Sequence, residues 1–315
     1  MTELKAGQTA RLFRSTPPFA GRYRDTGATT HMDQIFNLSF IPKIPLGPYG
    51  KVIFNWFTLN FDWFFRGMAW LIGIVLDGLV NTLLAVPPVL LVLGFAAIAY
   101  ALQRSWKLAL GTLLGFLLMY NQGLWKDTVQ TLVLVCASTL VSMSIGVPMG
   151  IWAAHSPKVW RVLNPVLDLM QTMPTYVYLI PALILFGLGM PSGMLVTVIF
   201  AAPAPLRMTY LGLTSIPKSL IEAGQSFGAT KSQLLWKVEL PAALPTIMAG
   251  VTQCIMLSLS MAVIAGLIGA AGLGNQVVRG LNQMNIPLGV EAGTCIVILA
   301  IILDRVTRLH TGAAK

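Results

Sequence analysis

The sequence has few charged residues, and this scarcity excludes most soluble protein classes. Only 10% of its 315 residues are Asp, Glu, Lys or Arg, whereas 56% are hydrophobic. Soluble domains usually carry about 25% charged residues, so a globule of this composition could not keep its apolar surface out of water. The apolar spans also lack the roughly ten-residue polar and apolar alternation of a transmembrane barrel. We therefore expect an all-α integral membrane protein.

Cysteine and histidine are also scarce, which excludes several kinds of site. The three cysteines, Cys136, Cys254 and Cys295, lie far apart within apolar runs, so neither a disulfide framework nor a CxxC metal site is expected. The three histidines form no HExxH motif, and GATKS at 228–232 lacks the spacing of a phosphate-binding loop. We expect no catalytic residue, no bound cofactor and no metal site. The chain lacks the residues that a membrane-embedded enzyme would need.

The N-terminal part differs from the rest of the chain. Residues 1–31 are polar, basic and without periodicity, so we expect a disordered extension, and the sequence leaves open whether it is native. Residues 32–86 form an aromatic-rich region typical of the membrane–water interface. Within it, 68–86 is interrupted by Asp77 and Asn81, which leaves either an amphipathic interfacial helix or a true crossing.

From residue 87 to 308 the pattern predicts a transmembrane domain, followed by a cytoplasmic tail at 309–315. A helix needs about 20 residues to span the hydrocarbon core, so the shorter segments need flanking residues or a thinned bilayer. We expect about seven crossings, at 89–102, 108–120, 128–154, 164–188, 194–213, 246–269 and 290–303. Prolines inside them predict kinked helices, which are tolerated where neighbouring helices or a cavity satisfy the freed carbonyls.

Basic residues predict the orientation. The net charge is +10, and in a membrane protein such residues meet lipid headgroups rather than nucleic acid. With seven crossings, one side carries Arg104, Lys107, Lys158, Arg161, Arg207, Lys218, Lys231, Lys237, Arg305, Arg308 and Lys315. The other side carries only Lys126 and Arg279 outside the N-terminal region. The first side, with the C-terminus, is therefore expected in the cytoplasm. The basic N-terminus would then lie outside unless 68–86 crosses.

One stretch between two crossings is polar and helix-friendly: EAGQSFGATKSQLLWKVELP, residues 222–241. Its apolar residues recur at helical spacing, Gly228 interrupts the first helix, and we expect Pro241 to stop the second. This predicts a helix–turn–helix on the cytoplasmic side. Periodicity alone leaves open a linker that rests on the protein's own bundle.

The spacing within this stretch resembles the signature loop of ABC importer permeases, E-A-A-x3-G-x9-I-x-L-P. There are two departures, because Gly224 replaces Ala and Val238 replaces Ile. The matching residues are Glu222, Ala223, Gly224, Gly228, Val238, Leu240 and Pro241. The segments 167–189 and 257–280 also resemble permeases that import glycine betaine, proline betaine, choline and related osmoprotectants. The resemblance covers roughly residues 67–308.

The resemblance implies the ABC importer permease fold and its partners. The coupling loop, 215–245, would seat helices on a cytoplasmic ABC ATPase dimer, which binds ATP and Mg²⁺ itself. Small Ala223 and Gly224 would allow close approach to that partner. A second permease copy or a related permease would complete the pathway, and an external binding protein would deliver a quaternary ammonium substrate. The localisation implied is the bacterial inner membrane, with multiple passes.

Two groups of residues are candidates for the pathway itself. Pro174, Tyr176, Tyr178 and Pro181 lie in a kinked crossing where aromatic faces could contact a permanent cation. The alternative is that the tyrosines pack between helices. In the glycine-rich outer stretch 269–280, Gly272, Gly274 and Asn275 could contact the binding protein or close an outer gate.

Asp168 begins the kinked crossing. We expect it to be structural and to lie beside Arg161.

Two other functions remain open. An importer for another small solute, such as methionine or another amino acid, would share the coupling loop. An autonomous secondary transporter or channel would need intramembrane acids or a sodium site, and both the few central charges and the loop spacing disfavour it.

Overall fold

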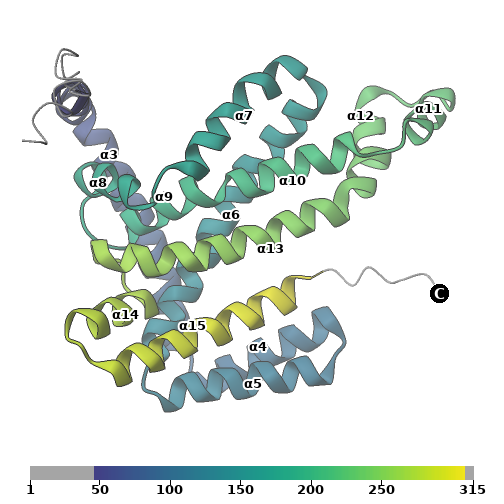
Figure 1. Cartoon of the computed structure of the whole chain (residues 1–315). Coiled ribbons are helices and arrows are strands. Elements are labelled where there is room, and N and C mark those ends of the chain that lie inside the picture. Colours follow the sequence, from purple (N-terminus) through teal and green to yellow (C-terminus); the bar gives the residue numbers. More distant parts are fainter. Residues whose placement is uncertain (1–45, 309–315) are drawn as a thin grey trace, which may run out of the picture. The chain divides into compact units, whose positions relative to one another are not determined.

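The computed structural model describes residues 46–308, and every regular element within that range is helical (Figure 1). The predicted extension at 1–31 and tail at 309–315 lie outside the described residues. The chain divides into two compact units, residues 1–54 and residues 55–315. The boundary falls within the first helix. All helix contacts and candidate sites described below lie within the second unit. The elements are α3 (Leu46–Ala85), α4 (Pro88–Gln103), α5 (Trp106–Asn121), α6 (Trp125–His155), α7 (Pro157–Thr172), α8 (Tyr176–Phe186), α9 (Met190–Ala201), α10 (Pro203–Thr214), α11 (Lys218–Ser226), α12 (Lys231–Leu234), η2 (Leu235–Glu239), α13 (Leu240–Ala265), η3 (Gly266–Ile268), α14 (Leu273–Asn282) and α15 (Ile286–Thr307).

By length and apolar composition, the described residues hold five helices that could cross a membrane, or six if the bent pair α7–α8 is one span. The sequence pattern predicts about seven, and the difference has two sources. The helices α4 and α5 are only 16 residues each, about 24 Å long against a core of about 30 Å. Conversely, Gly47–Ala85 in α3 qualifies as a span, so the crossing alternative for 68–86 meets the length and composition requirement.

The helices α4 and α5 form a hairpin whose ends follow from local sequence. Pro88 occupies the first turn of α4, where its missing N–H costs no hydrogen bond. Arg104 ends that helix in the left-handed conformation, with φ at 46°. Phe95 of α4 stacks on Phe116 of α5, with ring centroids 5.0 Å apart. This pair joins the hairpin to the core.

The centre of the second unit is α6, against which α9, α10 and α13 pack (Figure 1). Small residues let these helices approach closely, as is usual in membranes. A Cβ on Gly150 of α6 would lie 2.7 Å from the carbonyl oxygen of Leu206 in α10. Nearer the beginning of α6, the Thr139 hydroxyl oxygen lies 3.5 Å from the Ser258 hydroxyl oxygen of α13. The core therefore combines close backbone packing with polar contacts between helices.

Candidate functional site

The polar stretch at 222–241 folds as the predicted helix–turn–helix (Figure 1). Helix α11 ends at Ser226, and Gly228 then takes a φ of +77°, which glycine adopts at little steric cost. The turn is closed by the N–H of Gly228, which donates to the Gln225 carbonyl at 2.8 Å. The N–H of Ala229 donates to the Gly224 carbonyl at 3.2 Å. These bonds reverse the chain between two short helices.

A capping box begins the second helix, and the sequence reading missed it. The Thr230 hydroxyl accepts from the backbone N–H of Gln233 at 3.3 Å, and the Gln233 side chain accepts from the Thr230 N–H at 2.9 Å. The T-x-x-Q pattern is the sequence signal that could have revealed it. Together with Gly228, it makes the turn a defined structure.

Pro241 does not end the second helix, contrary to the sequence prediction. After α12 the chain makes one π-helical turn, η2, in which the Leu240 N–H donates to the Leu235 carbonyl. Pro241 then lies in the first turn of α13, where a helix tolerates its missing N–H. The wider π turn lets the backbone run on without a break. The coupling loop is thus continuous with a membrane helix that reaches Ala265.

The signature residues of the loop fall into two groups. Glu222 and Ala223 are exposed. Gly224 instead faces its own chain, because a Cβ there would lie 2.8 Å from Leu234 Cδ1 and 3.5 Å from Val238 Cγ2. The small size of Gly224 therefore serves packing between α11 and the following helix. Leu240 is half-buried.

Two aromatic side chains of the loop protrude from the chain. Phe227 is 93% exposed and Trp236 is 67% exposed. Both lie on the segment that links α11 to α13, beyond the packed helices of the core (Figure 1). This chain therefore leaves both aromatic rings uncovered on its polar loop.

The loop is joined to α6 by an imidazole–carboxylate contact that the sequence did not reveal. Nε2 of His155, in the last turn of α6, lies 2.9 Å from Oε2 of Glu239 in η2. Glu239 is buried, and no local pattern signals a pairing of residues 84 positions apart. The loop is therefore linked to α6 by this contact, in addition to its continuity with α13.

The predicted kink lies between α7 and α8, which meet at 96°. Met173 is extended because Pro174 disfavours helical backbone at the residue before it. The Tyr178 hydroxyl donates to the Met170 carbonyl at 2.9 Å and so braces the bend. Tyr176 is 60% exposed, and Pro181 lies inside α8. The structure thus separates the two tyrosines: Tyr178 is bonded within the chain and Tyr176 is accessible.

The glycine-rich stretch at 269–280 is a tightly packed corner that leads into helix α14. Gly272 caps α14 with φ at +127°, and the Leu273 N–H donates to the Thr131 hydroxyl of α6 at 2.8 Å. A Cβ on Gly274 would collide with the carbonyl of Ala262 in α13. Asn275 is half-buried, and its N–H donates to the Gly272 carbonyl at 3.0 Å. These residues hold α14 against α6 and α13.

A second link between α14 and α6 is polar. The Gln276 amide donates to both carboxylate oxygens of Asp127, each at 3.1 Å. Asp127 lies in the first turn of α6, where a carboxylate also interacts favourably with the helix dipole.

Asp168 has a different partner from the one predicted. Arg207 of α10 donates to Asp168 of α7 at 2.6 Å, whereas the sequence reading placed Asp168 beside Arg161. The rings of Trp160 and Tyr210 stack in parallel between the same two helices, with centroids 3.6 Å apart. Arg161 is nearer to Asp168 in the sequence, but folding brings α10 against α7, and this makes Arg207 the partner of Asp168.

Among residues 46–308, no cluster of three His, Cys, Asp or Glu side chains could hold a metal ion. The described residues therefore offer an exposed loop, a helix that continues from it and a side-chain contact from the loop to α6.

Residues 146–311 match the family described as binding-protein-dependent transport system inner membrane component. The chain is 46% identical over 268 residues to the glycine betaine transport system permease protein OpuAB of Bacillus subtilis, covering 85% of this chain and 95% of that protein. It is 44% identical to the glycine betaine/carnitine transport permease protein GbuB of Listeria monocytogenes, covering 87% and 98%. An inward-facing MetNI methionine ABC transporter structure superposes with a TM-score of 0.53 at 26% identity, covering 59% and 94%.

Proposed function

Because the chain belongs to the family of binding-protein-dependent transport system inner membrane components, we propose that it forms the translocation pathway of an ATP-driven importer for glycine betaine and related quaternary ammonium compounds. The observation that carries this proposal is identity above 40% to betaine permeases over most of both chains. The accessible aromatic ring of Tyr176 at the α7–α8 bend is compatible with a cationic substrate.

The coupling loop supports an ATPase partner. Phe227 and Trp236 are large apolar side chains left uncovered by this chain, and aromatic residues often dominate protein interfaces. We propose that they seat on a separate ATPase dimer, which binds ATP and Mg²⁺, while this chain binds no cofactor. A second permease copy or a related permease and an external binding protein would complete the importer.

The proposed orientation follows from the basic residues. The loop and the C-terminus face the cytoplasm, and α14 faces the outside of the bacterial inner membrane. In the proposed mechanism of alternating access, ATP-driven movement of the loop passes through η2 into α13 and through Glu239 into α6. The pathway helices then rearrange because α6, α10 and α13 pack as one group.

A second candidate is an importer for an amino acid. It is favoured by the superposition on the methionine transporter, which has the same fold at lower identity than the betaine permeases. Both candidates need an ATPase and a binding protein, so only the transported solute separates them.

The test is uptake into proteoliposomes that contain this chain, its neighbouring ATPase and its binding protein. Radiolabelled glycine betaine, choline, carnitine and methionine are each supplied outside, with ATP inside. We expect uptake of a quaternary ammonium compound, and none from matched vesicles without the ATPase. Uptake without the ATPase would contradict the importer mechanism. Uptake of methionine alone would contradict the proposed substrate class.

A further inference from the structure

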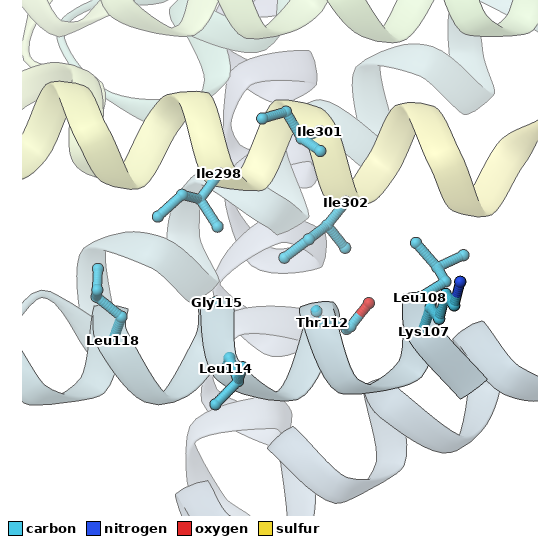
Figure 2. Close-up of a pocket in the computed structure, with 10 residues that line it drawn as sticks. Lys107, Leu108, Thr112, Leu114, Gly115, Leu118, Ile298, Ile301 and Ile302 are labelled. Carbon is cyan, nitrogen blue, oxygen red and sulfur yellow. The ribbon is translucent and has the colours of Figure 1, made fainter. Parts of the chain in front are cut away.

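A groove of about 380 Å³ runs between α5 and α15 (Figure 2). These two helices lie away from the coupling loop and from the bend between α7 and α8 (Figure 1). Its volume falls within the range of pockets that bind small ligands, about 300–1,000 Å³. Apolar side chains line nearly all of it. The residues that give it its shape and its polar end are Lys107, Gly111, Thr112, Gly115, Ile298 and Ile302.

Two glycines shape the groove in different ways. A Cβ on Gly115 would lie 2.7 Å from Ile298 Cγ2 and 3.0 Å from Ile302 Cδ1, so α5 and α15 touch at that level. A Cβ on Gly111, one turn earlier, would meet nothing within 4 Å. The helices are in contact at Gly115 and leave open space at Gly111.

The groove has a polar end. The Thr112 side chain is 1% exposed, and its hydroxyl has no hydrogen-bond partner. Figure 2 shows that this hydroxyl points toward the end of the groove where Lys107 lies. A buried hydroxyl without a partner costs free energy, so a ligand oxygen at this end would be favoured.

The length and charge of the groove suit one class of ligand. From Lys107 to Leu118 the groove follows twelve residues of α5, a length of about 16.5 Å at a rise of about 1.5 Å from each residue to the next. Half of the hydrocarbon core is about 15 Å, so the groove matches the depth of one leaflet. At its polar end, Gln103 donates to the Val306 carbonyl at 2.9 Å, which brings Arg104 of α4 and Arg305 of α15 to the side where Lys107 lies. Basic pockets between membrane helices attract anionic headgroups.

We propose that the α5–α15 groove binds one acyl chain of an anionic phospholipid from the leaflet at the Lys107 end, with the headgroup phosphate at Lys107. Gly111 makes room for the chain, and the Thr112 hydroxyl donates to an oxygen of the lipid. That this is the cytoplasmic leaflet rests on the proposed orientation of the chain. The binding itself requires neither transport nor the ATPase.

The test uses the full-length chain in phosphatidylcholine nanodiscs that contain a trace of phosphatidylglycerol with a diazirine on its acyl chain. After irradiation, mass spectrometry measures the lipid attached to α5 and α15 peptides. Diazirine-labelled phosphatidylcholine of the same chain length serves as the headgroup control. We expect phosphatidylglycerol to label these helices about fivefold more than phosphatidylcholine, since one basic residue near the surface attracts anionic lipid by about that factor.

Two pairs of variants make the test specific. Gly111→Leu should remove the labelling, because the leucine side chain fills the open space. The control is Gly94→Leu, at an exposed position of α4 where a Cβ also meets nothing within 4 Å, and it should leave the labelling unchanged. Lys107→Gln should clearly reduce the preference for phosphatidylglycerol, whereas Lys158→Gln, exposed on α7, should leave that preference unchanged.

Three results would overturn the proposal. Equal labelling by both lipids would mean ordinary lipid contact without a site. Unchanged labelling in Gly111→Leu would place the lipid elsewhere. An oxidant-induced dimer formed by Gly111→Cys, and not by the unsubstituted chain, would show that a second copy covers the groove. None of these three measurements depends on transport, so they test the lipid site even if the uptake experiment fails.

Discussion

Nε2 of His155 lies 2.9 Å from Oε2 of Glu239, and Nδ1 of the same ring lies 2.9 Å from the Ile151 carbonyl oxygen. The carbonyl can only accept, so Nδ1 carries a proton. The contact at Nε2 then needs a second proton, either on the ring or on the carboxylate. The pair ties the end of α6 to η2, the turn that joins the coupling loop to α13.

Replacement of His155 by Ala should weaken both folding and coupling. Glu239 would be left buried without a partner. A hydrogen bond to a charged group contributes about 1.5–3 kcal/mol, and we expect the lower end because the His155 side chain is 49% exposed. The measurements are the thermal unfolding midpoint and the solute imported per ATP hydrolysed.

Glu239→Gln is the matched control, because its amide can donate to Nε2 of a neutral His155 ring. We expect it to keep the unfolding midpoint near that of the unsubstituted protein. If His155→Ala imported as much solute per ATP as the unsubstituted protein, the contact between His155 and Glu239 would have no part in coupling.

Gly228→Asp should leave the bundle folded but reduce uptake strongly. A Cβ there meets nothing within 4 Å, so the side chain fits, but the φ of +77° strains any residue with a Cβ by about 1–2 kcal/mol. The turn would shift, and a charge would enter the loop beside Phe227. Uptake and co-purification of the ATPase measure the effect.

Gly228→Asn has the same shape as Gly228→Asp and a similar tolerance of positive φ, but it lacks the charge, so it should retain more uptake. Normal transport by the Asp variant would contradict the role assigned to this loop.

Gly274→Ala should destabilise the glycine-rich corner at 269–280. Its Cβ would collide with the carbonyl of Ala262, which belongs to backbone and cannot rotate away. We expect a loss of about 1–3 kcal/mol, typical of overpacking, seen as a lower unfolding midpoint in detergent.

The control is Gly293→Ala in α15, where a Cβ meets nothing within 4 Å. Alanine is the better helix former by about 1 kcal/mol, so this variant should be neutral or slightly more stable. Equal stability of the two variants would be inconsistent with the packing described for α14.

Tyr176→Ala should reduce uptake of a quaternary ammonium solute by about two- to fivefold, because an exposed cation–π contact contributes about 0.5–1 kcal/mol. Tyr176→Phe retains the aromatic face and should transport normally. Initial rates over a range of solute concentrations measure the difference.

Tyr178→Phe separates the ring from its hydroxyl. It loses the bond to the Met170 carbonyl that braces the bend, so its unfolding midpoint should fall while its solute preference stays the same. If Tyr176→Ala left uptake unchanged, Tyr176 would not line the pathway.

The sequence predicted those features that depend on local composition and spacing. Low charge and long apolar runs predict membrane helices, and Gly228 predicts the turn because few other residues take a positive φ. Pro174 likewise predicts the bend between α7 and α8. The resemblance of the loop to ABC permeases was confirmed by the family match over residues 146–311.

Local patterns could not predict where helices begin, continue or meet. Pro241 was expected to stop a helix, but the preceding π turn, η2, absorbs it. The number of candidate spans differed from the pattern because α4 and α5 are short and α3 is long.

The sequence by itself thus determined the membrane class, the turn at Gly228 and the bend, because the first depends on overall composition and the other two on a few neighbouring residues. Only the tertiary structure decided that Glu239 pairs with His155, that Arg207 pairs with Asp168 and that Gly111 leaves a groove beside α15. Those relationships join residues 39 to about 190 positions apart, and they arise only when packing has set which faces of the helices meet.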